Sequence, residues 1–212
     1  MKLVLGSDLH GHLPDVPSCD VLVLAGDILP ENDQELFIEK YLKPWLNWAR
    51  VRNIVATGGN HDHKLFKRQS YYQSLDCRLR WSLLIDRSTI IDGLKFHGTP
   101  WCLPIGRWAW QAPEYILEKI YAMIPDDVDV LISHTPPYEI LDKTDPDPLK
   151  GKPSEHAGSS ALIRRMAKLD KLKLLVCGHI HEARGRDGIV INASSLNRQY
   201  QLRPNPWVEL EL

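Results

Sequence analysis

The chain has 212 residues, of which 43% are hydrophobic and 25% charged, and its formal net charge is −1. This size and mixture are typical of a globular protein with a substantial core, so we expect a single domain over residues 1–212. The near-neutral charge gives no electrostatic field that would attract nucleic acid or an anionic membrane. It therefore argues against strong nucleic-acid binding.

The four cysteines show no C-x-x-C spacing, which argues against a zinc ribbon and against a dense disulfide framework; they are Cys19, Cys77, Cys102 and Cys177. The apolar run before Asp8 is too short for the core of a signal peptide or for a membrane span. We therefore expect a cytoplasmic protein that does not enter a membrane. The sequence leaves the oligomeric state open.

Five apolar segments share one plan, in which a short hydrophobic run ends abruptly in a residue able to bind metal. They are residues 2–8, 20–27, 52–60, 127–134 and 172–179. Continuous apolar runs of this length are typical of strands that are buried on both faces of a sheet. In sheets with helical connections, ligands gather beyond the carboxyl ends of the strands.

Helices are expected between these strands, over residues 32–50, 112–124 and 158–169. Asn32 or Asp33 is a plausible N-cap of the first, and Pro44 is expected to kink or split it. Ser159 is the expected N-cap of the third.

Residues 80–101 are expected to form consecutive short strands, with a hairpin turn at Asp92 and Gly93, and the tail 188–212 offers further strands. Because strands alternate with helices early and cluster late, we predict an α/β (α+β) fold built as a two-sheet β sandwich flanked by helices. Residues 139–157, rich in Pro, Asp and Lys, are expected to form a long surface loop.

The polar residues at the strand ends form one candidate metal-binding constellation: Asp8, His10, Asp27, Asn60, His61, His134, His179 and His181. Oxygen and imidazole ligands in this mixture suit Mn²⁺, Fe, Zn²⁺ or Co²⁺. Asp8 and His10, like His179 and His181, are two residues apart, a spacing that puts both side chains on one side of an extended backbone. Asp27 is the unpaired candidate for bridging two ions, which a two-metal site holds about 3.5–4 Å apart.

These motifs, Asp-x-His, Gly-Asp, Gly-Asn-His-Asp, a single His after a strand and Gly-His-x-His, resemble in this order the calcineurin-like metallophosphoesterase superfamily. The resemblance extends from residue 3 to about 195. The segments "GTPW", "SHTPPYEILD" and "INASS" more narrowly resemble the small metallophosphoesterase-domain-containing proteins related to the brain 239 protein.

The resemblance implies two divalent transition-metal ions, with Mn²⁺ favoured over Fe, Zn²⁺, Co²⁺ or Ni²⁺. It assigns the first ion to Asp8, His10, Asp27 and His181, and the second to Asp27, Asn60, His134 and His179. It also implies that His61 faces the substrate phosphate and protonates the leaving oxygen, while Asp62 orients its ring. Gly58 and Gly59 are expected to let the backbone turn tightly beneath the site.

Several aromatic and histidine side chains have open roles. His12 and His63 flank the motifs without filling a position in them, and His97 and His156 are expected at the surface or satisfied in the core. Trp101, Trp108 and Trp110 could line a substrate pocket, but core packing is the favoured interpretation.

The leading hypothesis is a phosphodiesterase acting on a small phosphoester, such as a nucleotide or cyclic nucleotide, through a hydroxide that bridges the two metals. The alternatives are a phosphomonoesterase on the same site and a non-catalytic metal-binding scaffold. A nuclease acting on long DNA would need a binding platform, which neither length nor charge offers.

Overall fold

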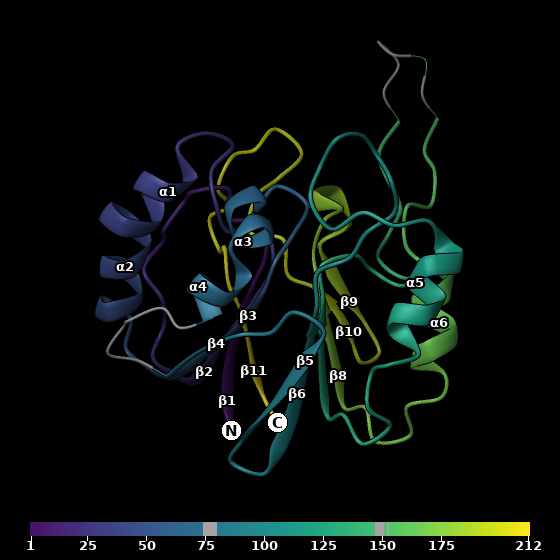
Figure 1. The fold of residues 1–212 in the computed structure, drawn as a ribbon, viewed down its shortest axis with the longest axis horizontal. Helices are drawn as coiled ribbons and strands as arrows, with labels where there is room; N and C mark the ends of the chain where they lie inside the picture. The colour runs from purple at the N-terminus through teal and green to yellow at the C-terminus, as the bar shows by residue number, and fades with distance from the viewer. Residues whose placement is uncertain (74–79, 147–150, 152) are drawn as a thin grey trace.

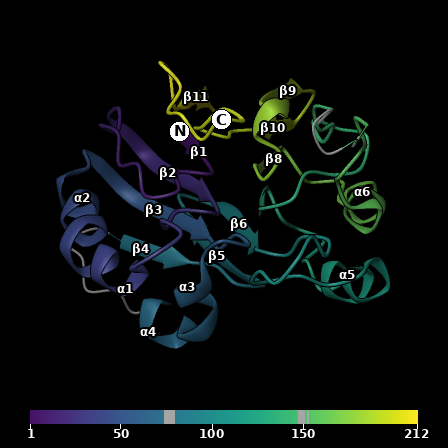
Figure 2. The ribbon, with the colours of Figure 1, turned by 90° about the horizontal axis from the view of Figure 1, so that it is seen from above.

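The computed structural model describes residues 1–73, 80–146, 151 and 153–212. Its strands form two sheets that pack against each other, and helices cover the outer side of each sheet (Figures 1 and 2). This arrangement confirms the predicted two-sheet β sandwich flanked by helices.

The first sheet has five strands in the order β11-β1-β2-β3-β4. Their bounds are β1 Lys2–Gly6, β2 Cys19–Ala25, β3 Val51–Thr57, β4 Arg80–Leu83 and β11 Val208–Glu211. The strands β1 to β4 run parallel, while β11 pairs antiparallel with β1. The carboxyl ends of the parallel strands therefore meet at one edge of the sheet.

The second sheet has six strands in the order β5-β6-β7-β8-β10-β9. Their bounds are β5 Arg87–Ile91, β6 Leu94–Thr99, β7 Val130–Ser133, β8 Leu174–Cys177, β9 Gly185–Asp187 and β10 Val190–Asn192. Asp92 and Gly93 join β5 to β6 with φ angles of 48° and 83°. Two positive φ values in a two-residue turn are typical of a tight hairpin, as predicted.

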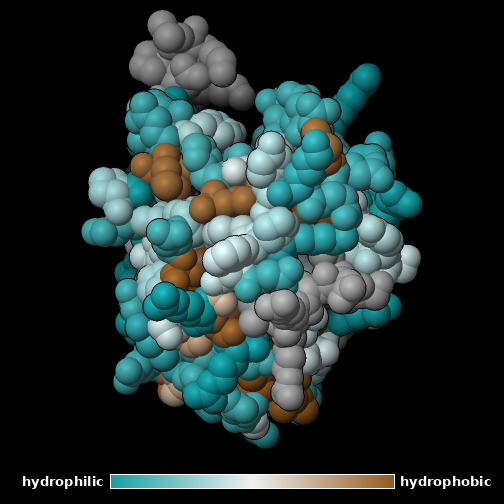
Figure 3. Space-filling model, turned by 90° about the vertical axis from the view of Figure 1, so that its left-hand side faces the viewer, coloured by the Kyte–Doolittle hydropathy of each residue, from teal (hydrophilic) through white to brown (hydrophobic). Residues whose placement is uncertain are grey.

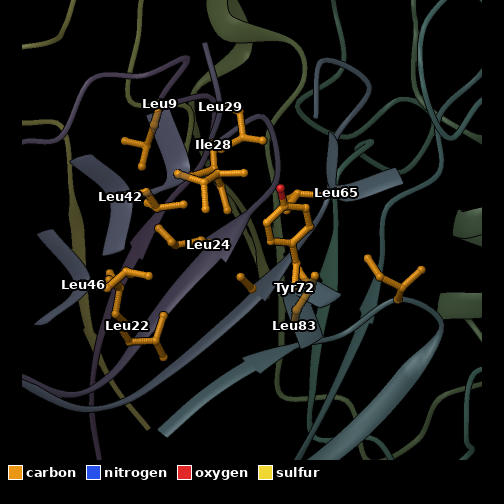
Figure 4. Close-up of a cluster of buried hydrophobic side chains, with 14 of the residues drawn as sticks. Leu9, Leu22, Leu24, Ile28, Leu29, Leu42, Leu46, Leu65, Tyr72 and Leu83 are labelled. Carbon is orange, nitrogen blue, oxygen red and sulfur yellow. The ribbon is translucent and has the colours of Figure 1, made fainter. Parts of the chain in front are cut away.

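Side chains of the first sheet alternate between two hydrophobic clusters, because successive residues of a strand point to opposite faces. Leu3 and Leu5 join the cluster between the two sheets, whereas Val4 joins the cluster under the outer helices. In β2, Leu22 and Leu24 belong to that outer cluster (Figure 4). Burial of one such side chain stabilises the fold by roughly 1.5–3 kcal/mol, so both faces hold the sheet in place.

The helical segments connect the strands and cover both outer faces. Their bounds are α1 Gln34–Phe37, η1 Ile38–Leu42, α2 Lys43–Trp48, α3 His63–Lys67, α4 Gln69–Gln73, α5 Glu114–Tyr121, α6 Ser160–Met166 and η3 His181–Ala183. The helices α1 and α2 lie beside the first sheet, and α5 and α6 beside the second (Figure 2). The short helices α3 and α4 were not predicted.

The predicted helix over residues 32–50 is helical without a break over residues 34–48, because α1, η1 and α2 follow one another directly with right-handed helical angles at their junctions. The wider π-helical turn η1 directly precedes the turn that holds Pro44, so the helix is irregular at the proline but is not split there. Asp33 is the N-cap residue but makes no side-chain capping hydrogen bond, whereas the Oγ atom of Ser159 accepts one from the backbone N–H of Leu162. Ser159 is therefore the functional cap.

The loop predicted over residues 139–157 contains no helix or extended strand in its described part, although Lys143 and His156 form an isolated bridge. Asp145 donates its backbone N–H to Glu182 Oε1 at 2.9 Å, which ties the loop to the residue after His181. A cavity of about 550 Å³ lies between this loop and residues 182–184. Lys150 and Lys152 of this loop lie outside the described residues.

Cys19, Cys102 and Cys177 are free and buried, and Cys77 lies outside the described residues. In the part of the chain that the structure describes, no helix combines the length and apolar character needed to cross a membrane. The face that carries α1 and α2 mixes hydrophobic residues with hydrophilic ones (Figure 3). Isolated exposed side chains such as Trp48, 84% exposed, are normal on a protein surface.

Candidate metal centre

The polar residues that follow the strands meet at the junction of the two sheets. Asp8 and His10 follow β1, Asp27 follows β2 and Asn60 follows β3, whereas the second sheet supplies three histidines: His134 after β7, with His179 and His181 after β8. All seven lie where we predicted them, beyond carboxyl ends of parallel strands.

The backbone at this junction turns sharply, because four of the residues have positive φ: Asp8 (54°), His10 (43°), Asp27 (50°) and His179 (68°). Residues other than glycine seldom adopt this conformation, and it persists only where the surroundings enforce it. Two hydrogen bonds enforce it here, from Asp8 N to Gly26 O at 3.0 Å and from His10 N to Asp27 O at 2.9 Å. Such enforced strain is common at functional sites.

Asp27 occupies the centre of the site and is 2% exposed. Its Oδ2 atom lies 3.7 Å from His10 Nε2 and 3.4 Å from His134 Nε2, so one carboxylate faces a histidine of each sheet. Its Oδ1 atom accepts the backbone N–H of His61 at 2.7 Å. The carboxylate of Asp27 therefore lies within reach of histidines from both sheets.

Glycines allow this close approach. A Cβ atom on Gly59 would lie 2.3 Å from Asp27 Oδ1, and one on Gly58 would lie 2.3 Å from the Trp110 ring. The expected tight turn is present, because Asp62 donates its backbone N–H to the carbonyl oxygen of Gly59 at 3.0 Å and closes a turn over residues 59–62. Neither glycine has positive φ, so both positions require glycine for lack of space and not for a left-handed backbone.

One group of ligand atoms surrounds Asp8. His181 Nε2 lies 3.4 Å from Asp8 Oδ1, and the rings of His10 and His181 are 5.3 Å apart. Asp8, His10 and His181 each place one ligand atom within 4.8 Å of the other two. His10 Nε2 is buried without a hydrogen-bond partner among the described residues, which is costly unless a cation or water completes it.

The second group surrounds His134, whose side chain is fully buried. Its Nε2 atom lies 2.9 Å from Asn60 Oδ1, and its Nδ1 atom lies 2.9 Å from the carbonyl oxygen of Ala25. The ring of His179 lies 4.9 Å from that of His134. The unpaired Nε2 atom of His10 fits a bound divalent transition-metal ion. The oxygen and imidazole donors of the two groups suit the same ions.

The site's charges favour cation binding. Burial alone would raise the pKa values of Asp8 and Asp27, but the facing imidazoles of His181 and His134 outweigh it and hold both pKa values well below the usual range. Burial lowers the pKa of His10 to about 4, so its ring is neutral. Burial also opposes protonation of His134, yet the adjacent Asp27 raises its pKa to about 9. A cation bound there would displace that proton.

Asp62 does not orient the ring of His61, contrary to our expectation. Its carboxylate accepts backbone N–H groups of Leu29 at 2.8 Å, Gly59 at 2.9 Å and Ile28 at 3.3 Å. Burial and then the charge of Asp27 raise its pKa to about 7. Adjacent side chains in this turn point in different directions, and Asp62 points inward to hold the loop.

His61 is partly exposed beside the two ligand groups, and its ring stands edge-on to His10 with a centroid distance of 4.7 Å. One ring nitrogen of His61 lies within 4.8 Å of a ring nitrogen of His10 and of a carboxylate oxygen of Asp27. His63 begins α3, and its ring lies 5.6 Å from that of Trp108. Of the three remaining open histidines, His12 is exposed, while His97 bonds Ser88 and His156 bonds Asp142.

Sequence reasoning missed several neighbours of the site. The ring of Tyr200 lies 4.9 Å from His10 and 5.0 Å from His181, and nothing in its sequence context indicates this. Ser194 donates its hydroxyl to Asp8 Oδ2 at 2.7 Å, and it belongs to the "INASS" segment that carried part of the resemblance. Trp110 is buried core, as favoured, but Trp108 lies on His61 with a centroid distance of 4.1 Å.

The sequence is similar to those of known proteins. The sequence model described as calcineurin-like phosphoesterase matches residues 1–183. Metallophosphoesterase domain-containing protein 1 of Homo sapiens is 28% identical over 243 residues, which cover 100% of this chain and 71% of the human protein. A UPF0046 protein of Caenorhabditis elegans is 26% identical and covers 98% of this chain and 74% of its own length.

Two further matches support fewer conclusions about this chain. The probable rhamnogalacturonate lyase C of Emericella nidulans is 29% identical over 88% of this chain, but the matched part is only 18% of that protein. The crystal structure of TT1561 of Thermus thermophilus superposes with a TM-score of 0.61 at 15% identity, covering 91% of this chain and 88% of that one. At this identity the likeness establishes the fold alone.

Proposed function

Because the chain belongs to the calcineurin-like phosphoesterase family, we propose that it is a metal-dependent phosphodiesterase that hydrolyses nucleotides or cyclic nucleotides. The observation that carries this proposal is Asp27, whose carboxylate lies between a histidine of each ligand group. One shared carboxylate between two groups of ligands is the arrangement that a dinuclear site requires.

Each ion has four candidate ligands. The first would be held by Asp8, His10, Asp27 and His181, and the second by Asp27, Asn60, His134 and His179. When bound, such a pair of ions supplies positive charge at the phosphoryl oxygens and lowers the pKa of water toward neutrality. Mn²⁺ is the first ion to test, with Fe, Zn²⁺, Co²⁺ and Ni²⁺ as alternatives.

His61 serves as the general acid in this proposal. It is partly exposed beside the ligand groups, and the family resemblance assigns it no metal, although its ligand atom lies within 4.8 Å of those of His10 and Asp27. Its backbone N–H donates to Asp27, which keeps the residue beside the proposed ions. A general acid gives its proton to the leaving oxygen as the bond to phosphorus breaks, which contributes about 10²–10⁴-fold to the rate. Asp62 and Gln34 hold the loop, since Gln34 Nε2 donates to the carbonyl oxygen of His61 at 2.6 Å.

The basic residues near the site support a diester over a monoester. A monoester dianion benefits from extra fixed cations, whereas a diester carries one negative charge. Lys64 pairs with Glu35 at 2.7 Å, and the Arg184 guanidinium donates to three backbone carbonyls: Ser194, Pro206 and Trp207. Both side chains nearest in sequence to the ligands are thus engaged elsewhere.

The test is a comparison of kcat/KM for bis-p-nitrophenyl phosphate and p-nitrophenyl phosphate with Mn²⁺, followed by 2′,3′- and 3′,5′-cyclic nucleotides. We expect the diester to be hydrolysed faster, and the Asp27→Ala variant, purified identically, controls for contaminating phosphatases. Equal rates, or a faster monoester, would replace this proposal with a phosphomonoesterase. Metal-loaded protein that hydrolyses none of these substrates would point to a non-catalytic scaffold.

A further inference from the structure

Trp108 lies against His61 although it belongs to none of the sequence motifs. The two rings have a centroid distance of 4.1 Å and an interplanar angle of 35°. Trp108 is partly exposed, in the segment between β6 and α5. Its flat face therefore covers one side of the histidine that we assign to proton transfer.

No hydrogen bond from the described residues holds the ring of His61. The hydrogen bonds of His61 run through its backbone: its N–H donates to Asp27 Oδ1, and its carbonyl oxygen accepts from Gln34 Nε2 and His63 N. Asp62, the residue expected to hold the ring, bonds backbone N–H groups instead. The ring of His61 contacts the rings of His10 and Trp108, and the Asp27 carboxylate lies within 4.8 Å of it, so packing and charge orient the ring in place of a hydrogen bond.

Trp108 is itself fastened to the loop that carries His61. The next residue, Ala109, donates its backbone N–H to the carbonyl oxygen of Asn60 at 2.9 Å. Trp110, 1% exposed, packs so closely on Gly58 that a Cβ atom there would meet its ring at 2.3 Å. Residues 108–110 thus contact the loop at two places, with Trp110 packed on Gly58 and Trp108 against the ring of His61.

We propose that Trp108 is the positioning residue of His61 and holds its ring where it can protonate the leaving oxygen of the substrate. The inference rests on the proposed hydrolase function. As the bond from phosphorus to the leaving oxygen breaks, that oxygen keeps the electron pair and takes the proton of His61. The attacking water gives its hydroxide to phosphorus and its other proton to solvent, which reprotonates His61.

The experiment measures kcat and KM of Trp108→Ala for methyl p-nitrophenyl phosphate, which has a good leaving group, and for a dialkyl phosphate, which has a poor one. A misplaced acid should reduce kcat for the poor leaving group by about 10- to 10²-fold, and kcat for the good one by less than about threefold. The Trp108→Phe variant keeps a flat ring and should restore most of the loss. Trp48→Ala, which removes a tryptophan at the exposed end of α2, is the matched control.

The same substrates are then measured in His61→Ala and in the double variant. If Trp108 acts through His61, its removal should cost nothing further for the poor leaving group once His61 is gone. Equal losses for both leaving groups, or a full further loss in the double variant, would overturn the inference. A wild-type protein that hydrolyses neither substrate would instead overturn the proposed function.

A measurement on the wild-type protein covers the case in which Trp108→Ala does not fold. The ring protons of His61, assigned in an NMR spectrum with the help of His61→Ala, should be displaced by the ring current of the indole. Resonances at ordinary histidine positions would show that Trp108 does not cover His61 in solution and would overturn the inference.

Discussion

The two sheets contribute different chemistry to the same site. The first supplies every candidate oxygen ligand, from Asp8, Asp27 and Asn60, while the second supplies only imidazoles, from His134, His179 and His181. The closest contacts between imidazole and carboxylate groups in the site cross between the sheets, from His181 to Asp8 and from His134 to Asp27. Neither sheet holds both groups of candidate ligands by itself, so the proposed metal centre requires the packing of one sheet on the other.

The Asp27→Ala variant attacks this shared arrangement most directly. Both ion positions need this carboxylate, so we expect the metal content to fall from two ions per chain towards none and activity to fall to background. Elemental analysis together with the diester assay checks this, with Asp15→Ala at the surface as the control. Full metal content and full activity in Asp27→Ala would show that the carboxylate is not shared.

The His61→Ala variant separates proton transfer from metal binding within the first sheet. We expect it to keep both ions and to lose about 10²–10⁴-fold in rate on a diester with a poor leaving group. The loss should shrink with p-nitrophenolate, which leaves without a proton. An undiminished rate on the poor leaving group would remove His61 from the mechanism.

Metal binding should stabilise the packing of one sheet against the other, since its ligands come from both. An ion at about 100 times its Kd stabilises the folded state by about 2.7 kcal/mol. For a chain of this length that corresponds to a Tm increase on the order of 5–10 °C, measured by calorimetry with Mn²⁺ and with EDTA. His134→Ala should lose much of this increase, whereas an increase that survives in both His134→Ala and Asp27→Ala would place the stabilising ion elsewhere.

Ser194→Ala tests the support of the first sheet's Asp8. Its hydroxyl donates to Asp8 Oδ2 at 2.7 Å, and loss of such a hydrogen bond behind a ligand typically weakens metal affinity by about 10- to 100-fold. Activity at saturating metal should change little. Ser195→Ala is the matched control because its hydroxyl bonds the carbonyl oxygen of Pro206, and an equal effect of both variants would contradict the specific role.

The strands and the places of the candidate ligands could be predicted from the sequence, because each candidate ligand follows an apolar run within a few residues. Asp27 could be singled out from its lone position after β2, and the structure places it at the centre. The continuous apolar run of β2 was also informative, because Leu22 and Val23 point to opposite faces of the sheet and both faces are buried.

The other features of the site depend on the directions of side chains and the paths of loops, which residue spacing does not predict. Asp62 follows His61 in the chain, but its carboxylate points to the backbone of Ile28 and Leu29. Trp108 and Tyr200 reach the site from loops without periodicity, and the helices α3 and α4 are each five residues long, too short to show a helical pattern.

The most direct test of the shared site is a crystal structure of the Mn²⁺-loaded protein with anomalous scattering from manganese. Our account predicts two peaks about 3.5–4 Å apart, the spacing of two-metal sites, with the carboxylate of Asp27 bound to both ions and Trp108 over His61. A single peak, or two peaks of which Asp27 binds only one, would contradict it.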